Sequence, residues 1–193
     1  MFEFELDSAH FLIQRLPADL RSRTSFKEGG HLFSRPCYEA MVAVFFESMR
    51  KNGPDVVPFV GTAGVGKSCL FLYILIQWFR LCGGRQSFYY QISKDEILFF
   101  EVMKNGQFKL STMASAGSTL NVSLPLFVDM EEQCLPKHHG GKVFIFSSFQ
   151  PSRYKEITKE KVVYTVPAWS EGEYGTYMSY DHFWTDRGLD KVL

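Results

Sequence analysis

The chain has 193 residues, of which 46% are hydrophobic and 22% are charged, so its size and composition are those of one globular domain with its own core. Lysine plus arginine and aspartate plus glutamate both number 21, so the formal net charge is zero. No overall electrostatic field therefore favours nucleic acid or an anionic membrane as a partner. Aromatic residues make up 16% of the chain, and we expect the 19 phenylalanines to fill the core.

The N-terminal end does not have the pattern of a signal peptide. Residues Met1–Asp7 are acidic and lack the apolar stretch of a signal peptide. The longest apolar stretch, Cys69–Phe79, is much shorter than the roughly 20 residues that a membrane span needs. We therefore expect a soluble chain with no membrane partner, and the sequence leaves its compartment unknown. We divide it into an N-terminal extension, residues 1–30, and a domain, residues 31–193.

The first half of the chain predicts two long helices on either side of a buried strand. A short helix is expected around Phe11–Leu16. A longer helix is predicted over Pro36–Lys51, because proline suits the first helical position and apolar residues recur every three or four positions. The apolar run Val56–Val60 predicts a buried strand, and Gly66–Arg80 predicts a helix that is apolar nearly all round. Such a helix should be covered on more than one side.

The second half of the chain is rich in predicted strands. The dipeptide Asn105-Gly106 lies between two of them and is typical of a β-hairpin. A last helix should begin near Glu171 or Glu173 and continue to the end. Strands are expected at Ser87–Ile92, Ile97–Met103, Gln107–Thr112, Leu124–Val128, Lys142–Ser147 and Val162–Val166. Apolar strands separated by helices predict a three-layer α/β fold with a mostly parallel sheet of about five strands and a β-hairpin insertion.

One segment has the spacing of a phosphate-binding loop. Residues Gly61–Ser68 read Gly-Thr-Ala-Gly-Val-Gly-Lys-Ser, which fits the pattern G-x-x-x-x-G-K-[ST] between a strand and a helix. The glycines allow successive backbone N–H groups to face an anion, and the following helix adds its positive N-terminal end. We expect Lys67 to contact the β- and γ-phosphates and Ser68 to bind Mg²⁺. The predicted nucleotide-binding residues are Gly61, Thr62, Ala63, Gly64, Val65, Gly66, Lys67, Ser68 and Cys69.

A second polar position follows the apolar run Leu124–Val128. Asp129 lies 62 residues beyond Lys67 at the predicted end of a strand, where a carboxylate can hold Mg²⁺, usually through water. Many ATPases carry a glutamate directly after such an aspartate to orient the attacking water. Met130 occupies that place here, so Glu131 is our candidate for the role, out of the usual register. Lys67, Asp129 and Glu131 are therefore the candidate catalytic residues.

Two further polar groups are expected near the same site. Ser147 or Ser148, at the end of the strand beside the Asp129 strand, could sense the γ-phosphate, and a plain strand end is an equally good reading. Arg153 follows shortly and could reach a phosphate, although a solvated arginine is the simpler reading. The guanine-reading motif Asn-Lys-x-Asp is absent from the sequence, which favours ATP over GTP.

Several segments together resemble the P-loop NTPase module of Crinkler-type effectors and the related retrotransposon-hot-spot proteins. Residues Phe33–Tyr38 are similar to an aromatic-x-Arg-x-x-Tyr segment, and Gly61–Ser68 is similar to Gly-x-Pro-Gly-x-Gly-Lys-Ser with Ala63 in place of proline. Ser147–Phe149 is similar to a Ser-Ser/Thr-Ser-Pro turn, with Phe149 in place of proline. Residues Pro167–Glu173 resemble Pro-x-Trp-[ST]-x-x-Glu. The resemblance covers roughly residues 30–180.

The resemblance implies an ATP- and magnesium-dependent module of an effector-like protein. In that family the module usually lies between a header region and a C-terminal effector domain, and the proteins are linked to the host cell and its nucleus. The chain ends soon after the Trp-Ser segment, so we expect a domain truncated at its C-terminus. A protein partner or a missing effector domain would then respond to the nucleotide.

Three functions remain open on the sequence. The first is a module that binds ATP, could hydrolyse it slowly and acts as a switch. The second is a non-enzymatic interaction module with a degenerate nucleotide site, favoured by the displaced glutamate. The third is a small-molecule or nucleoside kinase, which ranks last because Arg153 and Arg187 are the only late arginines.

Overall fold

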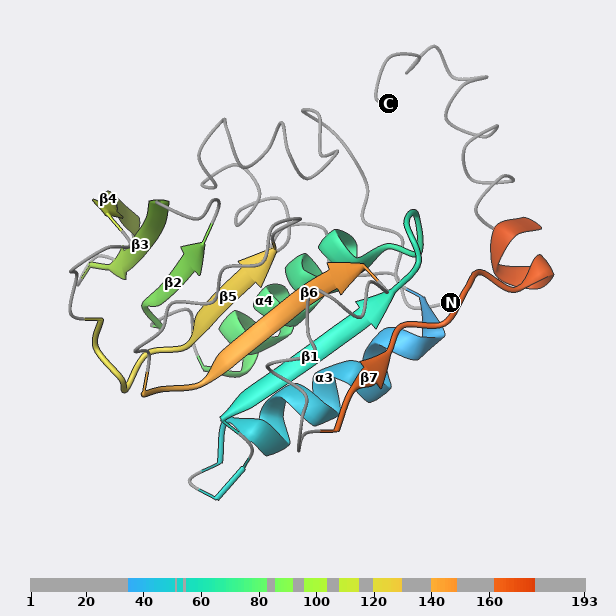
Figure 1. Cartoon of the computed structure of the whole chain (residues 1–193), viewed down its shortest axis with the longest axis horizontal. Coiled ribbons are helices and arrows are strands. Elements are labelled where there is room, and N and C mark those ends of the chain that lie inside the picture. Colours follow the sequence, from blue (N-terminus) through green and yellow to red (C-terminus); the bar gives the residue numbers. More distant parts are fainter. Residues whose placement is uncertain are drawn as a thin grey trace, which may run out of the picture.

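Within its described residues, the protein forms a seven-stranded sheet with two helices packed on it (Figure 1). The computed structural model describes residues 35–50, 52–53, 55–82, 86–91, 96–103, 108–114, 120–129, 140–148 and 162–175. The helices are α3 (Pro36–Ser48) and α4 (Lys67–Leu81). The strands are β1 (Val56–Gly61), β2 (Phe88–Gln91), β3 (Glu96–Val102), β4 (Phe108–Ala114), β5 (Leu126–Asp129), β6 (Val143–Ser148) and β7 (Tyr164–Thr165).

The sheet is mixed, so the prediction of a mostly parallel sheet of about five strands was wrong. The strand order is β4-β3-β2-β5-β6-β1-β7. The parallel pairs are β2–β5, β5–β6, β6–β1 and β1–β7. The antiparallel pairs are β2–β3 and β3–β4. The antiparallel β3–β4 pair expected around Asn105-Gly106 is confirmed, and the two dipeptide residues lie outside the described ones. The pair does not form a separate insertion, because it continues the same sheet beyond β2.

Both helices lie on one face of the sheet, behind the strands in Figure 1. Their buried side chains form one core cluster with alternate residues of the strands, including Phe59, Phe127 and Phe144. The opposite face forms a second, smaller cluster around Leu126 and Ile145. In the described part of the chain the predicted third layer is therefore not seen, and the arrangement is α/β with one helical layer. No helix within that part is long and apolar enough to cross a membrane.

Helix α4 is buried nearly all round because α3 covers one side of it and the sheet covers another. Nine of its residues are buried, Leu70 to Ile76 together with Trp78 and Phe79. Helix α3 begins with Pro36 at its first position, as predicted, and ends at Ser48, three residues earlier than expected. The chain turns there, since the amide of Arg50 donates to the carbonyl of Glu47 and the amide of Gly53 donates to that of Arg50.

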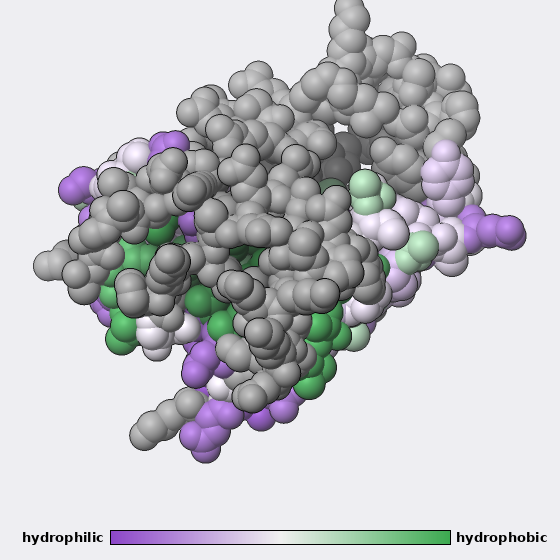
Figure 2. Space-filling view, viewed as in Figure 1, coloured by the Kyte–Doolittle hydropathy of each residue, from purple (hydrophilic) through white to green (hydrophobic). Residues whose placement is uncertain are grey.

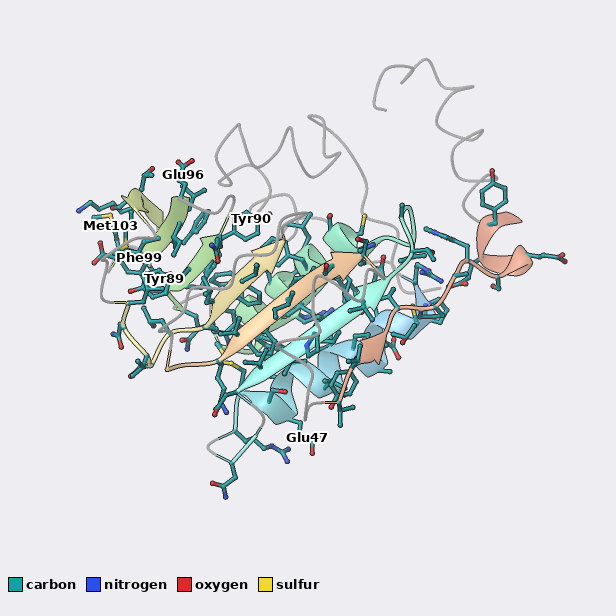
Figure 3. The ribbon with its side chains drawn as sticks, viewed as in Figure 1. Glu47, Tyr89, Tyr90, Glu96, Phe99 and Met103 are labelled. Carbon is teal, nitrogen blue, oxygen red and sulfur yellow. The ribbon has the colours of Figure 1, made fainter. Side chains whose placement is uncertain are left out.

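Aromatic rings fill the space between the helices and the sheet, as the composition predicted. Phe45 of α3 is fully buried and lies within 4.6 Å of the Phe144 ring and 5.7 Å of the Trp78 ring, measured between centroids. On the opposite face, Tyr89 of β2 and Phe99 of β3 lie side by side with centroids 4.9 Å apart (Figure 3). Figure 2 shows apolar surface at the same β2–β4 end of the molecule.

The parallel strands bring three predicted site segments to the same side of the sheet, at the carboxyl ends of the strands. Strand β6 lies between β1 and β5, and Gly61 is opposite Ser148 while Asp129 is opposite Phe146. Strand β1 is an interior strand and lies second from one end of the strand order, next to the outer strand β7. Since parallel strands end on the same side, the end of β1, the end of β5 and the serines of β6 share that side.

We expect Phe45→Ala to lower the free energy of unfolding by about 3–5 kcal/mol, because it removes a fully buried ring from a close-packed aromatic cluster. Urea unfolding followed by circular dichroism measures the change. Leu81→Ala is the control, because Leu81 is 68% exposed at the end of α4 and should cost about 0.5 kcal/mol or less. Equal losses for the two variants would contradict the described core.

Candidate functional site

The segment Gly61–Ser68, here called the glycine loop, joins the end of β1 to the start of α4. Strand β1 ends at Gly61, and α4 begins at Lys67 with Gly66 as its N-cap. Gly64 and Gly66 have φ angles of 78° and 86°, a left-handed region that side chains disfavour. Thr62, Ala63 and Gly64 are exposed, whereas Val65 is buried. The loop is thus an exposed turn attached to the protein through Val65 and its two ends.

Packing also restricts two of the glycines. A Cβ atom on Gly61 would lie 2.7 Å from Cγ2 of Val65 and 3.0 Å from the carbonyl oxygen of Val166. A Cβ atom on Gly66 would overlap the hydroxyl of Tyr38. Gly61 and Gly66, two of the fixed positions in the sequence pattern, therefore have no room for a side chain.

Lys67 reaches back across the loop from the first turn of α4. Its Nζ donates hydrogen bonds to the carbonyl oxygens of Gly61 at 3.1 Å and of Thr62 at 2.8 Å. The ammonium group therefore lies at the entrance of the loop, next to the N-terminal end of α4. Ser68 and Cys69 are partly buried in the same helical turn. A lysine and a helix start that meet in this way favour an anion.

Three side chains hold three successive carbonyl groups of the glycine loop. Trp169 Nε1 donates to the carbonyl of Gly64 at 3.0 Å, Arg35 Nη1 to that of Val65 at 2.8 Å, and Tyr38 Oη to that of Gly66 at 2.8 Å. We call these three side chains the carbonyl clamp. In a trans peptide the N–H points opposite to the preceding C=O, and no described peptide bond is cis. The clamp therefore turns the amides of the residues that follow each carbonyl away from itself.

Arg35 is the centre of the clamp and is completely buried. Nε and Nη2 donate to the two carboxylate oxygens of Glu173 at 3.1 and 3.2 Å. Nη1 also donates to the carbonyl of Pro167, and Nη2 to that of Ala168, both at 2.9 Å. With the bond to Val65, each of the five N–H donors of the guanidinium has an acceptor. The plane also lies against the Trp169 ring, 4.6 Å from its centroid, so this buried charge is fully compensated.

Glu173 lies in a helical turn over residues 171–175, seen beyond β7 in Figure 1, and Ser170 caps this turn. Glu173 Oε2 accepts hydrogen bonds from the amide and the hydroxyl of Ser170, and the Ser170 hydroxyl accepts one from the amide of Glu173. This reciprocal pair is a capping box. The hydrogen bond from Arg35 is the main reason that the pKa of Glu173 falls from 4.5 to about 2, so Glu173 is ionised at neutral pH.

The Tyr38 hydroxyl is a donor at any physiological pH. Its ring is 1% exposed, and burial raises the pKa of the phenol far above its usual range. The hydroxyl therefore keeps its proton and donates it to the carbonyl of Gly66. That same carbonyl accepts the amide of Leu70 at 2.8 Å, so Tyr38 and the first turn of α4 bind one oxygen together.

The remaining predicted site residues are placed less completely. The backbone of Asp129 lies at the end of β5, next to β6. Ser147 is buried, Ser148 is partly buried, and Ser147 Oγ lies 3.4 Å from the carbonyl of Ser148 as a donor. Glu131 and Arg153 lie outside the described residues. Among the described residues no three side chains of His, Cys, Asp or Glu gather as a metal-binding group.

Sequence reasoning identified the glycine loop but missed the residues that hold it. Arg35, Tyr38 and Trp169 entered only through a family resemblance, without a role, and Glu173 entered otherwise only as a possible start of the last helix. The predicted helix start near Glu171 is confirmed, its continuation beyond residue 175 lies outside the described residues, and the capping-box spacing Ser-x-x-Glu over residues 170–173 is the local signal for that start. Nothing local in the sequence indicates that Arg35 is buried, because its acceptors are mostly more than 100 residues away.

Comparison of the chain with protein-family models, with curated proteins and with solved structures found no match.

We expect Glu173→Gln to destabilise the protein by about 2 kcal/mol at neutral pH, because hydrogen bonds to a charged group contribute about 1.5–3 kcal/mol. A lowered carboxyl pKa stabilises the fold at pH values above 4.5, and this contribution is lost as the pH falls through about 2. The difference between wild type and variant should therefore be constant from pH 7 to about 4.5 and then shrink.

Urea unfolding at several pH values measures this difference. Glu171→Gln is the matched control, because it removes the same charge from an exposed position in the same helical turn. A difference that persists unchanged down to pH 2, or an equal effect of the control, would be inconsistent with the Arg35–Glu173 pair.

Proposed function

We propose that the glycine loop binds a nucleoside triphosphate, ATP, together with Mg²⁺. The observation that carries the proposal is the carbonyl clamp, which turns the amides of Val65, Gly66 and Lys67 away from the three bonded carbonyls. Successive amides that converge beside a helix N-terminus and a lysine form a nest for phosphate oxygens. The residues present therefore fit a polyphosphate, and the resemblance to P-loop NTPases supports the same ligand.

Each residue of the loop has a separate task in this proposal. The amides of Val65, Gly66 and Lys67 bind phosphate oxygens, and Lys67 Nζ neutralises their charge. Ser68 Oγ, in the first turn of α4, binds the metal ion, and Asp129 at the end of β5 holds it through water. The metal ion would supply positive charge to the phosphate oxygens as negative charge develops on them. Ser147 and Ser148 belong to β6, between β5 and β1, and are the candidates to sense the terminal phosphate.

The proposal includes slow hydrolysis, with Glu131 orienting the attacking water. Since Met130 occupies the position directly after Asp129, we expect a rate that suits a switch better than a rapid ATPase. The resemblance to Crinkler-type effectors extends the proposal to a nucleotide-dependent switch that acts on a protein partner or on an effector domain in a longer chain. Action in a host cell or its nucleus is part of that same extension.

One observation favours a second function, a non-enzymatic interaction module. The two hydrogen bonds that Lys67 makes to Gly61 and Thr62 direct its ammonium group to carbonyl oxygens of the loop itself. A loop that is closed on its own lysine can be a rigid surface element with no need of a phosphate. On this reading Lys67→Ala leaves partner binding unchanged.

Titration of a fluorescent ATP analogue with Mg²⁺ tests the proposal. We expect the analogue to bind saturably, and we expect ATP to displace it better than GTP does. We expect Lys67→Ala to weaken it by roughly 10- to 100-fold, since it removes a charged hydrogen-bond donor. Lys142→Ala is the matched control, because Lys142 lies at the opposite end of β6 and binds Gly53 and Asp55 there.

Either of two results would contradict nucleotide binding by the glycine loop. One is a wild-type protein that is folded by circular dichroism and does not bind the analogue with or without Mg²⁺. The other is equal affinity of wild type and Lys67→Ala. Both results would favour the interaction module.

A further inference from the structure

We propose that Arg35, Tyr38 and Trp169 are positioning residues for the phosphate-binding amides, and that the capped turn over residues 170–173 sets phosphate affinity through Arg35. This inference rests on the proposed function and deepens it. None of these side chains is expected to contact the nucleotide, because each binds a carbonyl oxygen of the loop and the amides point the other way.

The peptide planes of the glycine loop need such a restraint. Gly64 and Gly66 adopt left-handed φ angles, and glycine also reaches other conformations at little cost. Gly64 is exposed, and a Cβ placed on it would meet nothing within 4 Å, so no packing holds this part of the loop. A flipped Gly64–Val65 peptide would turn its amide away from the phosphate and break the bond from Trp169. The clamp therefore selects the binding-competent orientation.

The clamp is itself held by the segment that follows β7. The amide of Val166 donates to the carbonyl of Val60 at 2.7 Å, which fixes the start of this segment beside β1. Pro167 and Ala168 then give two carbonyls to Arg35, and Glu173 gives both carboxylate oxygens. Trp169 lies between these acceptors with its ring on the guanidinium. The position of the indole N–H thus depends on the Arg35–Glu173 pair.

Thermodynamic linkage gives this arrangement a regulatory consequence. If the ordered 170–173 turn raises the affinity of the loop for phosphate, bound nucleotide must stabilise the turn by the same free energy. The chain that continues beyond residue 175 is attached to this turn. A partner or domain that pulls the turn out of place would therefore release the nucleotide without touching it.

Trp169→Phe and Tyr38→Phe test the proposal with minimal change. Each removes one hydrogen-bond donor and keeps an aromatic ring, over Arg35 in the first case and in the core in the second. We expect each to weaken binding of Mg-ATP and Mg-ADP about 2- to 10-fold, the effect of one neutral hydrogen bond. Tyr164→Phe is the matched control, because Tyr164 of β7 packs on Phe59 of β1 and the substitution should leave affinity unchanged.

A second pair of variants tests the link to the turn. Glu173→Gln should weaken ATP binding, and the double variant Glu173→Gln with Trp169→Phe should lose less than the product of the two single losses, since both act through one clamp. Thermal unfolding without nucleotide is measured for every variant. A merely structural role would lower the melting temperature and leave the affinity for ATP and ADP at the wild-type value.

The outcomes separate this inference from the function on which it rests. Wild-type affinity in both Trp169→Phe and Tyr38→Phe, in a wild-type protein that binds ATP, overturns the inference alone. Independent, multiplicative losses in the double variant overturn the link to the turn. A folded wild type that binds no nucleotide overturns the proposed function and this inference together.

Discussion

The structure around the glycine loop depends on one buried cation. Arg35 has no exposed surface, so its charge is tolerated only because every N–H donor has an acceptor and a carboxylate neutralises it. Its acceptors come from the glycine loop, from the segment after β7 and from the 171–175 turn. Removal of any one of these would leave a buried donor unsatisfied. Arg35 therefore joins three stretches of chain, the glycine loop among them, into one hydrogen-bonded unit.

This constraint explains how an exposed loop can have a defined shape. The carbonyl side of the loop faces the clamp, and its glycines bring the backbone close enough for Tyr38 to reach Gly66. Any larger residue at Gly66 would displace the Tyr38 hydroxyl and break that contact. The requirement for glycine thus comes from the protein side of the loop as well as from the side where the proposed phosphate lies. Both requirements apply to the same short segment, so a side chain at Gly66 would be unfavourable on either side of the loop.

The sequence predicted the elements well and their arrangement only in part. Helix α4 and strands β1, β5 and β6 were found within a few residues, because apolar runs and flanking glycines and prolines are local signals. Strand direction is not local, so the antiparallel β2–β3 pair and the mixed sheet were missed. The glycine loop was found because its residues are consecutive in the sequence. The clamp was missed because its contacts join residues 28 to 138 positions apart, and burial of an arginine has no signature in the chain.

The sheet order separates two tasks onto the two sides of β1. On one side, β6 and then β5 carry the serines and Asp129 that the proposed function assigns to the metal ion and the terminal phosphate. On the other side, β7 leads into the residues that hold the loop from behind. Groups that would face the nucleotide and groups that shape the loop therefore belong to different neighbours of one strand. On the proposed function, a displacement of the 170–173 turn would therefore act on the loop from the β7 side of β1, opposite the strand ends that carry the serines and Asp129.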